Sequence, residues 1–340
     1  MNAHVDITAL AIANGAIPDL AWYDRILVAF SGGKDSVACV LTLLENGVPP
    51  SKIMLIHHEV DGREGSSLMD WPSTPAYCEA FARWFGFEMI SSWRRGGFEA
   101  EMNRQQQPTQ GVSFERGNAL THLQGAKNAP LGTRLAYPQV AADLSVRWCS
   151  AALKIDVADR VLCNDPLFER SKTLFVTGER GEESPNRARY AQFEPHRADR
   201  RDGKKGRLVD HWRPVLRLLE QEVWAIIARF GVVPHPAYQA GFGRLSCRNC
   251  IFASDDQWAT LALHDPKGIK AISAYELKFG RTIHRKLSVR ERIARGTPYE
   301  AATPELMARA LSTTFEGPIV IDPADWTMPA GAFKGHSGPT

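Results

Sequence analysis

A six-residue turn at 31–36, Ser-Gly-Gly-Lys-Asp-Ser, constrains this chain more than any other stretch. It follows an apolar, strand-like run at 26–30 and precedes a helix-like run at 37–44, which an Asn-Gly pair would end. Gly32 and Gly33 let the backbone approach an anion and take positive φ, and the start of a helix presents unpaired N–H groups. The pattern predicts a phosphate-binding turn between a strand and a helix. The alternative is an ordinary glycine-containing turn.

The length and composition allow a soluble enzyme. The 340 residues are 44% hydrophobic, which is enough for one large core or two smaller ones. No run approaches the roughly 20 apolar residues of a membrane span, and the first 20 residues lack the basic and apolar blocks of a leader peptide. We therefore expect a cytoplasmic protein with no membrane partner. The net charge of +3 does not by itself indicate nucleic acid.

Short apolar runs alternate with helix-like runs through much of the chain. The strand-like runs after the turn are 53–57, 88–92 and 173–177, and helix-like runs include 77–85 and 151–162. This alternation predicts an α/β fold with a doubly wound, mainly parallel sheet and helices on both faces, followed by a helical C-terminal region.

The expected organisation has three parts: an N-terminal extension at 1–24 with a weakly helical segment at 7–13, a nucleotide-binding domain at 25–254, and a helical region with its tail at 255–340. Inside the domain the alternation dissolves at about 93–145, where Gln, Asn, Gly and Pro dominate. Such an insertion is either a lid or substrate-binding loop, or a loop without function.

Two polar segments follow predicted strands, at the edge where open α/β sheets bind ligands. The first contains Asp61, a candidate contact for a nucleotide ribose or base, although a solvated loop explains it equally well. The second contains Gly178, Arg180 and Arg187. Guanidinium groups bind phosphate oxygens in pairs, so both arginines are candidate phosphate ligands. The alternative is a surface ion-pair loop with Glu182 and Glu183.

Basic residues gather in two further regions. Residues 187–217 hold ten Lys or Arg against four acids, and the segment from Lys270 to Arg295 is also basic. Either region is a candidate for contact with nucleic acid, and a solvated surface is the competing interpretation.

Three of the six cysteines form a candidate metal site. Disulfides are not expected in a chain without a secretion signal, so metal binding or catalysis is considered first. Cys247 and Cys250 form a C-x-x-C pair, and Cys149 lies about a hundred residues upstream. Zinc would need further ligands, and a thioredoxin-like dithiol would need surroundings that this sequence does not show. We expect the other cysteines to be structural.

The turn at 31–36 is not a Walker-type loop, since Lys34 follows two adjacent glycines. It resembles the PP-loop of the adenine nucleotide alpha hydrolase superfamily, whose members split ATP between the α and β phosphates. The resemblance implies that the turn holds pyrophosphate while a substrate oxygen is adenylated. Lys34 would offset charge on the departing pyrophosphate, and Asp35 or Asp61 would help to hold Mg²⁺. The loop residues concerned are Ser31, Gly32, Gly33, Lys34, Asp35 and Ser36.

The strand at 173–177, with the Gly-x-Arg and Glu-Ser-x-x-Arg that follow, resembles the second nucleotide-binding element of the phosphoadenosine phosphosulfate reductase family. Iron–sulfur members of that family carry a cysteine pair before their C-x-x-C. Here Trp148 precedes Cys149, so three thiolates are offered to a 4Fe-4S cluster. The fourth iron is open, absent, or bound by another ligand such as His235. No cysteine follows Cys250, so the C-terminal nucleophile of the reductases is missing.

In motif order the chain is most similar to the ATP pyrophosphatases of DNA phosphorothioation systems. The resemblance implies that ATP adenylates an acceptor, with nucleic acid expected and DNA favoured over tRNA, for sulfur insertion. The implied cofactors are Mg²⁺ and an iron–sulfur cluster on Cys149, Cys247 and Cys250. A cysteine desulfurase or another sulfur donor is the implied protein partner, and a homo-oligomer is compatible with the sequence. The alternatives are a sulfonucleotide reductase and a non-catalytic, redox-sensing nucleotide-binding subunit.

Overall fold

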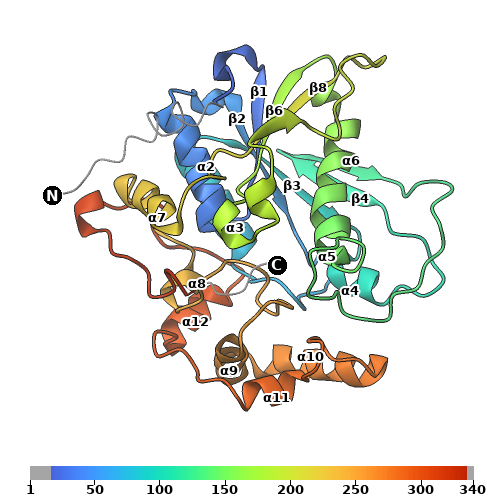
Figure 1. Cartoon of the computed structure of the whole chain (residues 1–340), viewed down its shortest axis with the longest axis vertical. Coiled ribbons are helices and arrows are strands. Elements are labelled where there is room, and N and C mark those ends of the chain that lie inside the picture. Colours follow the sequence, from blue (N-terminus) through green and yellow to red (C-terminus); the bar gives the residue numbers. More distant parts are fainter. Residues whose placement is uncertain (1–16, 335–340) are drawn as a thin grey trace.

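One eight-stranded sheet runs through the protein in the order β5-β4-β3-β2-β1-β6-β8-β7 (Figure 1). The computed structural model describes residues 17–334, so the predicted helical segment at 7–13 lies outside the described residues. The strands are β1 (Arg25–Ala29), β2 (Ile53–His58), β3 (Glu88–Arg94), β4 (Val112–Arg116), β5 (Ala119–Leu123), β6 (Lys172–Val176), β7 (Phe193–Pro195) and β8 (Leu208–Trp212).

The five central strands, β3, β2, β1, β6 and β8, are all parallel. Chain order reverses between β1 and β6, since the chain builds β2 and β3 on one side of β1 and returns to place β6 on the other. Such a reversal leaves a crevice outside the carboxyl ends of the two strands, where open α/β sheets bind ligands. The turn at 31–36 and the segment after β6 both begin at this crevice.

Helices cover both faces of the sheet, as predicted. Alternate residues of a strand point to opposite faces. Ile26 and Val28 of β1 pack in one core with α2, α3 and α7, while Leu27 packs in another with α6. The longer helices are α2 (Lys34–Glu45), α3 (Thr74–Phe85), α4 (Gly97–Met102), α6 (Asp156–Asn164), α7 (Glu220–Arg229), α9 (Asp255–His264), α10 (Pro266–Phe279) and α12 (Pro304–Ala310).

Short helical turns complete the elements. They are η1 (Leu20–Trp22), η2 (Pro50–Lys52), α5 (Trp148–Ser150), η3 (Ala151–Ile155), η4 (Pro166–Phe168), η5 (Gly181–Glu183), η6 (Arg187–Arg189), α8 (Pro236–Gln239), α11 (Val289–Ile293) and η7 (Pro323–Asp325). The single run that we predicted at 151–162 is divided, because η3 is a π-helix that joins α5 to α6. Within the described residues, no helix combines the length and apolarity that a membrane span requires.

The segment at 93–145 holds more structure than the sequence pattern indicated. It includes α4 and the antiparallel hairpin of β4 and β5, which extends the sheet beyond β3. Most side chains of β5 are exposed, because this strand lies at the edge of the sheet. An edge strand therefore need not carry the apolar run by which we recognised the central strands.

The helical C-terminal region is present as predicted. Helices α9 to α12 share a third core with α8 and with segments that flank the cysteines (Figure 1). Trp71, Trp148 and Trp258 are buried in this core, and Cys149, Cys247 and Cys250 pack against it. The helical region thus forms one wall around the predicted cysteine site.

Candidate active site

The turn at 31–36 joins β1 to α2, as the sequence predicted. Gly32 has the positive φ of +71° that we expected, whereas Gly33 has a φ of −76°. Our prediction for Gly33 was therefore wrong, because this residue is the N-cap of α2 and takes an extended conformation that any residue can adopt. The hydroxyl of Ser36 donates to the Gly33 carbonyl over 2.9 Å, which holds the turn closed.

Lys34 is the first residue of α2, and its side chain is only 4% exposed. Its Nζ lies 3.2 Å from Oδ2 of Asp35 and 3.9 Å from Oε1 of Glu220. Burial would lower the pKa of Lys34, but the negative charge of Asp35, together with Tyr238 and Glu220, raises it overall. Lys34 is therefore a buried cation at the N-terminus of a helix, where an anion is favoured.

Arg180 reaches the same turn from the end of β6. Its Nε donates to Oδ1 of Asp35 over 2.6 Å, and it also pairs with Glu182 and, at 3.8 Å, with Glu220. Burial would raise the pKa of Asp35, but the charges of Lys34 and Arg180 outweigh burial and lower it. Arg180 thus contacts the turn at 31–36, and its guanidinium is paired with carboxylates, as the ion-pair alternative describes. Its predicted role as a phosphate ligand stays a prediction.

Gly178 is needed for contact between the two elements. A Cβ at this position would lie 2.9 Å from the backbone carbon of Asp35 and 3.1 Å from the nitrogen of Ser36. Any larger residue would push the segment after β6 away from the start of α2. In the resemblance this glycine permits a close approach at the nucleotide-binding element. In the structure the backbone of Asp35 and Ser36 is what lies close to Gly178.

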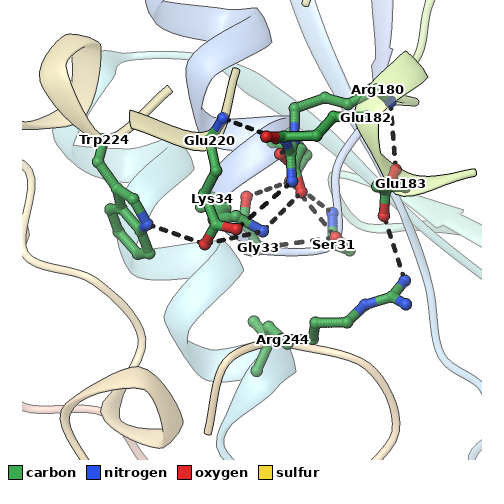
Figure 2. A network of polar contacts seen from close by, with 12 residues as sticks. Ser31, Gly33, Lys34, Arg180, Glu182, Glu183, Glu220, Trp224 and Arg244 are labelled. Atoms are coloured by element: carbon green, nitrogen blue, oxygen red, sulfur yellow. Dashed lines mark hydrogen bonds and ion pairs between the residues drawn. The ribbon is translucent and has the colours of Figure 1, made fainter. Parts of the chain in front are cut away.

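A cavity of about 450 Å³ opens in front of Lys34 and Arg180. In Figure 2 the acidic side chains converge on these two cations, and the indole nitrogen of Trp224 donates to Glu220. Phosphate groups entering here would have to compete with carboxylates for both cations. The cavity is lined by Lys34, Arg180, Glu182, Glu183, Leu219, Glu220, Gln221, Arg244 and Phe333.

Arg187 lies beside this cavity but does not line it. Its guanidinium pairs with Glu183, which also faces Arg244 at 3.4 Å. The ion-pair alternative therefore describes the present contacts of Arg187. Its predicted role as a phosphate ligand stays a prediction.

Asp61 binds backbone groups of its own loop and does not line the cavity in front of Lys34. Its two carboxylate oxygens accept the backbone N–H groups of Met69 and Asp70 over 2.8–3.0 Å, and the side chain is buried. Burial raises the pKa of Asp61 to about 6. Asp61 therefore closes the loop after β2, and its contact with a nucleotide or with Mg²⁺ stays a prediction.

Sequence reasoning missed three residues of the site. Glu220 begins α7, Arg244 lies in the loop after α8, and the hydroxyl of Tyr238 accepts the backbone N–H groups of Lys34 and Leu245 over 3.1 and 3.2 Å. Each is about 200 residues from the turn in sequence. No local pattern in the sequence shows which distant elements come into contact with the turn.

The three predicted cysteines come together from distant segments. Cys149 lies in α5, the other two follow α8, and all three pack against one core. Burial is the main cause that raises the pKa of Cys149 to about 11, and the nearby Cys250 raises it further. All three thiols favour the charged form of Lys154, which shows that they lie near its ammonium group. Between residues 17 and 334, however, no group of three or more His, Cys, Asp or Glu side chains is arranged to hold a metal ion.

The middle residues of the C-x-x-C pair fix its position. Asn249 donates through its backbone and its side chain to the carbonyls of Met69 and Leu68 over 3.1 and 2.7 Å, and Arg248 donates to the carbonyl of Ser67. The cysteine loop is thus attached to the loop that Asp61 closes. These contacts place the thiols beside the loop that follows the carboxyl end of β2.

His235, which we considered as a further cluster ligand, is used elsewhere. Its Nδ1 accepts the backbone N–H of Ala237 over 3.2 Å, and its Nε2 lies 3.0 Å from the hydroxyl of Ser73. The ring is fully buried, and burial lowers the pKa of His235 to about 3. Both ring nitrogens therefore serve the fold.

The basic segment at 187–217 is largely neutralised within the chain. Half of its ten cationic side chains form ion pairs with acids, namely Arg187, Arg197, Arg201, Lys205 and Arg213. Arg207 is buried and donates to backbone carbonyls. This segment therefore offers less free positive charge than its composition suggests.

Comparisons with known proteins agree with the sequence motifs. The family model described as the phosphoadenosine phosphosulfate reductase domain matches residues 25–253. Among curated proteins, an uncharacterized 37.8 kDa protein of Escherichia phage 186 is 26% identical over 264 residues, which cover 74% of each chain.

Two kinds of solved structure also share similarity. FMN adenylyltransferase of Candida glabrata, in complex with FMN and an ATP analogue, is 13% identical, with 72% of this chain and 67% of that chain covered and a TM-score of 0.39. Phosphoadenylyl-sulfate reductase of Candida auris, in complex with phosphate, is 12% identical, with 71% and 94% covered and a TM-score of 0.37. Similarity at this level carries no argument about the site.

Proposed function

Because the chain belongs to the phosphoadenosine phosphosulfate reductase domain family, we propose that it is a nucleotide-using enzyme that splits ATP into AMP and pyrophosphate and adenylates an acceptor. The observation that carries this proposal is the buried Lys34 at the start of α2, beside Arg180 and a cavity of about 450 Å³. A helix N-terminus with two cations favours a polyanion, and ATP supplies one.

The residues of the turn would act on the departing pyrophosphate. The backbone N–H groups at the start of α2 and Nζ of Lys34 would bind its oxygens, and Arg180 would position a neighbouring phosphate. Asp35, Glu220 and the hydroxyl of Tyr238 hold these groups before ATP arrives, so ATP would first exchange its phosphate oxygens for part of these contacts. Once ATP is bound, the fixed donors would need little further movement when charge develops on the leaving group.

Mg²⁺ is part of the proposal. This ion is usually held by one or two carboxylates together with the phosphates of the substrate, so an all-protein cage is not required. Asp35 and Glu220 offer carboxylate oxygens beside the cavity and fit that requirement. When bound, the ion would neutralise part of the phosphate charge.

We propose that the acceptor is a nucleic acid, with DNA ahead of tRNA, and that adenylation prepares it for sulfur insertion. The cysteine site supports this proposal, because thiols from two distant segments gather against one core. Cys149, Cys247 and Cys250 would hold an iron–sulfur cluster that supplies electron transfer or sulfur binding, and a separate donor protein would deliver the sulfur. Three cysteine thiols are the type of ligand that an iron–sulfur cluster requires, but among the described residues these side chains do not surround a common metal position.

Helix α10 supports a nucleic-acid acceptor. Its exposed face carries cations at Lys267, Lys270 and Lys278, and its single acid, Glu276, is buried. These lysines extend over about 16 Å of helix at 1.5 Å per residue. A row of exposed cations with no acid on the same face suits a phosphate backbone.

The experiment that tests the proposed function measures the products of ATP in anaerobically purified protein. We expect AMP and pyrophosphate, with turnover lowered about 100-fold or more in Lys34→Ala because one charge-stabilising donor is lost. Lys52→Ala is the matched control and should keep the parent rate, since Nζ of Lys52 donates to the carbonyl of Ala21 and Lys52 does not line the cavity. Release of ADP and phosphate by the parent would contradict the proposal.

Reduction of a sulfonucleotide is the second candidate, because the family takes its name from that reaction. Residues 251–340 contain no cysteine, whereas the resemblance to the reductases implied a thiol nucleophile after the C-x-x-C pair. Incubation with phosphoadenosine phosphosulfate and a dithiol reductant decides between the two. Sulfite would support the reductase, and its absence together with pyrophosphate release from ATP would support adenylation.

A further inference from the structure

The tail segment, residues 326–334, leads back to the cavity of the candidate site. Nε1 of Trp326 donates to a backbone carbonyl just after α7 over 2.7 Å, and the backbone N–H of Gly331 donates to the carbonyl of Tyr238 over 2.8 Å. A Cβ at Gly331 would lie 2.2 Å from the carbonyl oxygen of Phe242, so the tail segment packs directly on the loop after α8. These contacts attach it to the helix whose tyrosine also binds the start of α2.

Phe333 of the tail segment lines the cavity in front of Lys34 and Arg180. Its backbone N–H donates to Oε1 of Glu220 over 3.2 Å, and the same oxygen lies 3.9 Å from Nζ of Lys34. The other carboxylate oxygen of Glu220 lies 3.8 Å from the guanidinium of Arg180. One carboxylate therefore joins the tail segment to both cations of the candidate site.

The backbone of Phe333 has a conformation that bulky residues rarely adopt. Its φ is +62°, in the left-handed region, where a side chain with a Cβ is strained. Such strain is usually offset by burial or by fixed contacts, but the side chain of Phe333 is still 49% exposed. A strained residue with an exposed aromatic ring in a cavity suggests a role in binding rather than in the core.

The cavity combines apolar and charged groups. Phe333 and Leu219 are the apolar residues among those that the described structure places around it, and both are about half exposed. The other residues that line the cavity are charged or polar, and they include Lys34 and Arg180. A nucleotide has the same two parts, since its phosphates are charged and its base is flat and presents a π face on which aromatic rings stack.

We propose that the ring of Phe333 stacks on the adenine base of ATP while Lys34 and Arg180 bind its phosphates. This inference rests on the proposed function and names the side chain that recognises the base. The cavity of about 450 Å³ falls within the roughly 300–1,000 Å³ that is typical of small-ligand sites. Phe333 lies beyond residue 253, where the match to the family model ends, so the family does not assign this contact.

The test measures how tightly the full chain binds two probes, a non-hydrolysable ATP analogue and inorganic tripolyphosphate, which has no base. We expect Phe333→Ala to weaken binding of the ATP analogue about tenfold, because the stacking contact is lost, and to leave tripolyphosphate affinity unchanged within about twofold. Phe333→Tyr keeps the ring and should bind both probes like the parent. Met328→Ala is the matched control, since Met328 is a similarly exposed apolar residue of the tail segment that does not line the cavity.

Two outcomes would overturn the stacking contact. Equal weakening for both probes would show that Phe333 acts only on the cations through Glu220. Parent affinity for the ATP analogue in a Phe333→Ala variant that unfolds at the parent temperature would show that the ring does not touch the base.

The products of ATP are measured separately in the parent, so the two proposals can fail independently. Loss of affinity for the ATP analogue alone in Phe333→Ala, with release of ADP and phosphate by the parent, supports the stacking contact and contradicts the proposed function. Release of AMP and pyrophosphate by the parent, with unchanged affinity for the analogue in Phe333→Ala, supports the proposed function and contradicts the stacking contact.

Discussion

Lys34 and Arg180, the two cations at the turn that face the cavity, already have carboxylate partners. Asp35 accepts from both Lys34 and Arg180, and Glu220 lies within 4 Å of both. Buried charges persist only when they are paired, so these acids keep the two cations in place before a ligand arrives. The same acids must give up part of their contacts when phosphate binds. In the proposed function, ATP would therefore bind by exchanging its phosphate oxygens for part of these carboxylate contacts.

Asp61 allows a prediction about pH. Its folded pKa of about 6 is raised above the ordinary value of 3.8, chiefly by burial, so between these values the folded protein holds a proton that the unfolded chain has lost. Its contribution to stability is therefore present below about pH 4 and declines as pH rises towards 6. Asp61→Asn cannot ionise. Its free energy of unfolding should rise relative to the parent by about 1–3 kcal/mol between pH 4.5 and pH 7.

Urea unfolding of Asp61→Asn and the parent at both pH values measures this difference. Asp61→Asn also replaces one oxygen that accepts backbone N–H groups, which lowers the free energy of unfolding by the same amount at both pH values. This constant loss therefore cancels when the variant and the parent are compared between the two pH values. Asp322→Asn is the control, since Asp322 is exposed and caps η7 alone. A difference between variant and parent that stays the same at both pH values would contradict the raised pKa.

At the scale of elements, the turn at 31–36 works because three segments are joined around it. Gly178 brings the end of β6 against the start of α2, and the hydroxyl of Tyr238 binds the backbone of both the turn and the loop after α8. The reversal of strand order at β1 and β6 places the first two segments side by side. The geometry of the turn therefore depends on neighbouring segments and not on the turn alone.

The two glycines of the turn should respond differently to alanine. At Gly32 the φ is +71° and a Cβ would lie 3.0 Å from Cδ1 of Tyr77, so Gly32→Ala should lower the free energy of unfolding by about 1–3 kcal/mol. At Gly33 the φ is −76° and the nearest contact, with Oγ of Ser31, is 3.3 Å, so Gly33→Ala should cost less than about 1 kcal/mol. Denaturant unfolding measures both, each variant serving as the control for the other. Equal losses would show that the left-handed backbone at Gly32 is not the constraint.

At the scale of the whole molecule, one core holds the cysteine site together. It joins the loop after β2, helix α5, the C-x-x-C loop and the C-terminal helices, so the thiols depend on residues from about 60 to 311. Truncating the helical region would expose this core and release the cysteine loop. The C-terminal region is therefore part of the site rather than an appendage.

The cysteines give the prediction at this scale. Anaerobically purified protein should be brown and contain iron and sulfide, and Cys247→Ser should lose both because a cluster ligand is removed. Cys163→Ser is the matched control, since Cys163 packs against a different core and lies 3.3 Å from Arg207. Iron content and visible absorption measure the effect. Stoichiometric zinc in the parent, or an unchanged cluster in Cys247→Ser, would contradict the prediction.

Local patterns in the sequence predicted the fold class and four of the five central strands, but not β8, which lies inside the basic segment at 187–217. Apolar runs of strand length alternating with helical runs predicted the parallel sheet and its two helical layers, and two glycines with Lys34 predicted the turn after β1. These features are local because hydrophobic period and backbone freedom depend on neighbouring residues. The edge hairpin at 112–123 was missed because its outer strand is exposed and lacks an apolar run.

Only the tertiary structure decided how the site is assembled. Glu220, Tyr238 and Arg244 reach the turn from about 200 residues away, and Asp61 turns out to bind backbone in its own loop. Such contacts are set by strand order and by the packing of side chains in three cores, which no local period encodes. The sequence alone thus predicted the glycine-rich turn between a strand and a helix, and the fold decided which distant side chains surround it.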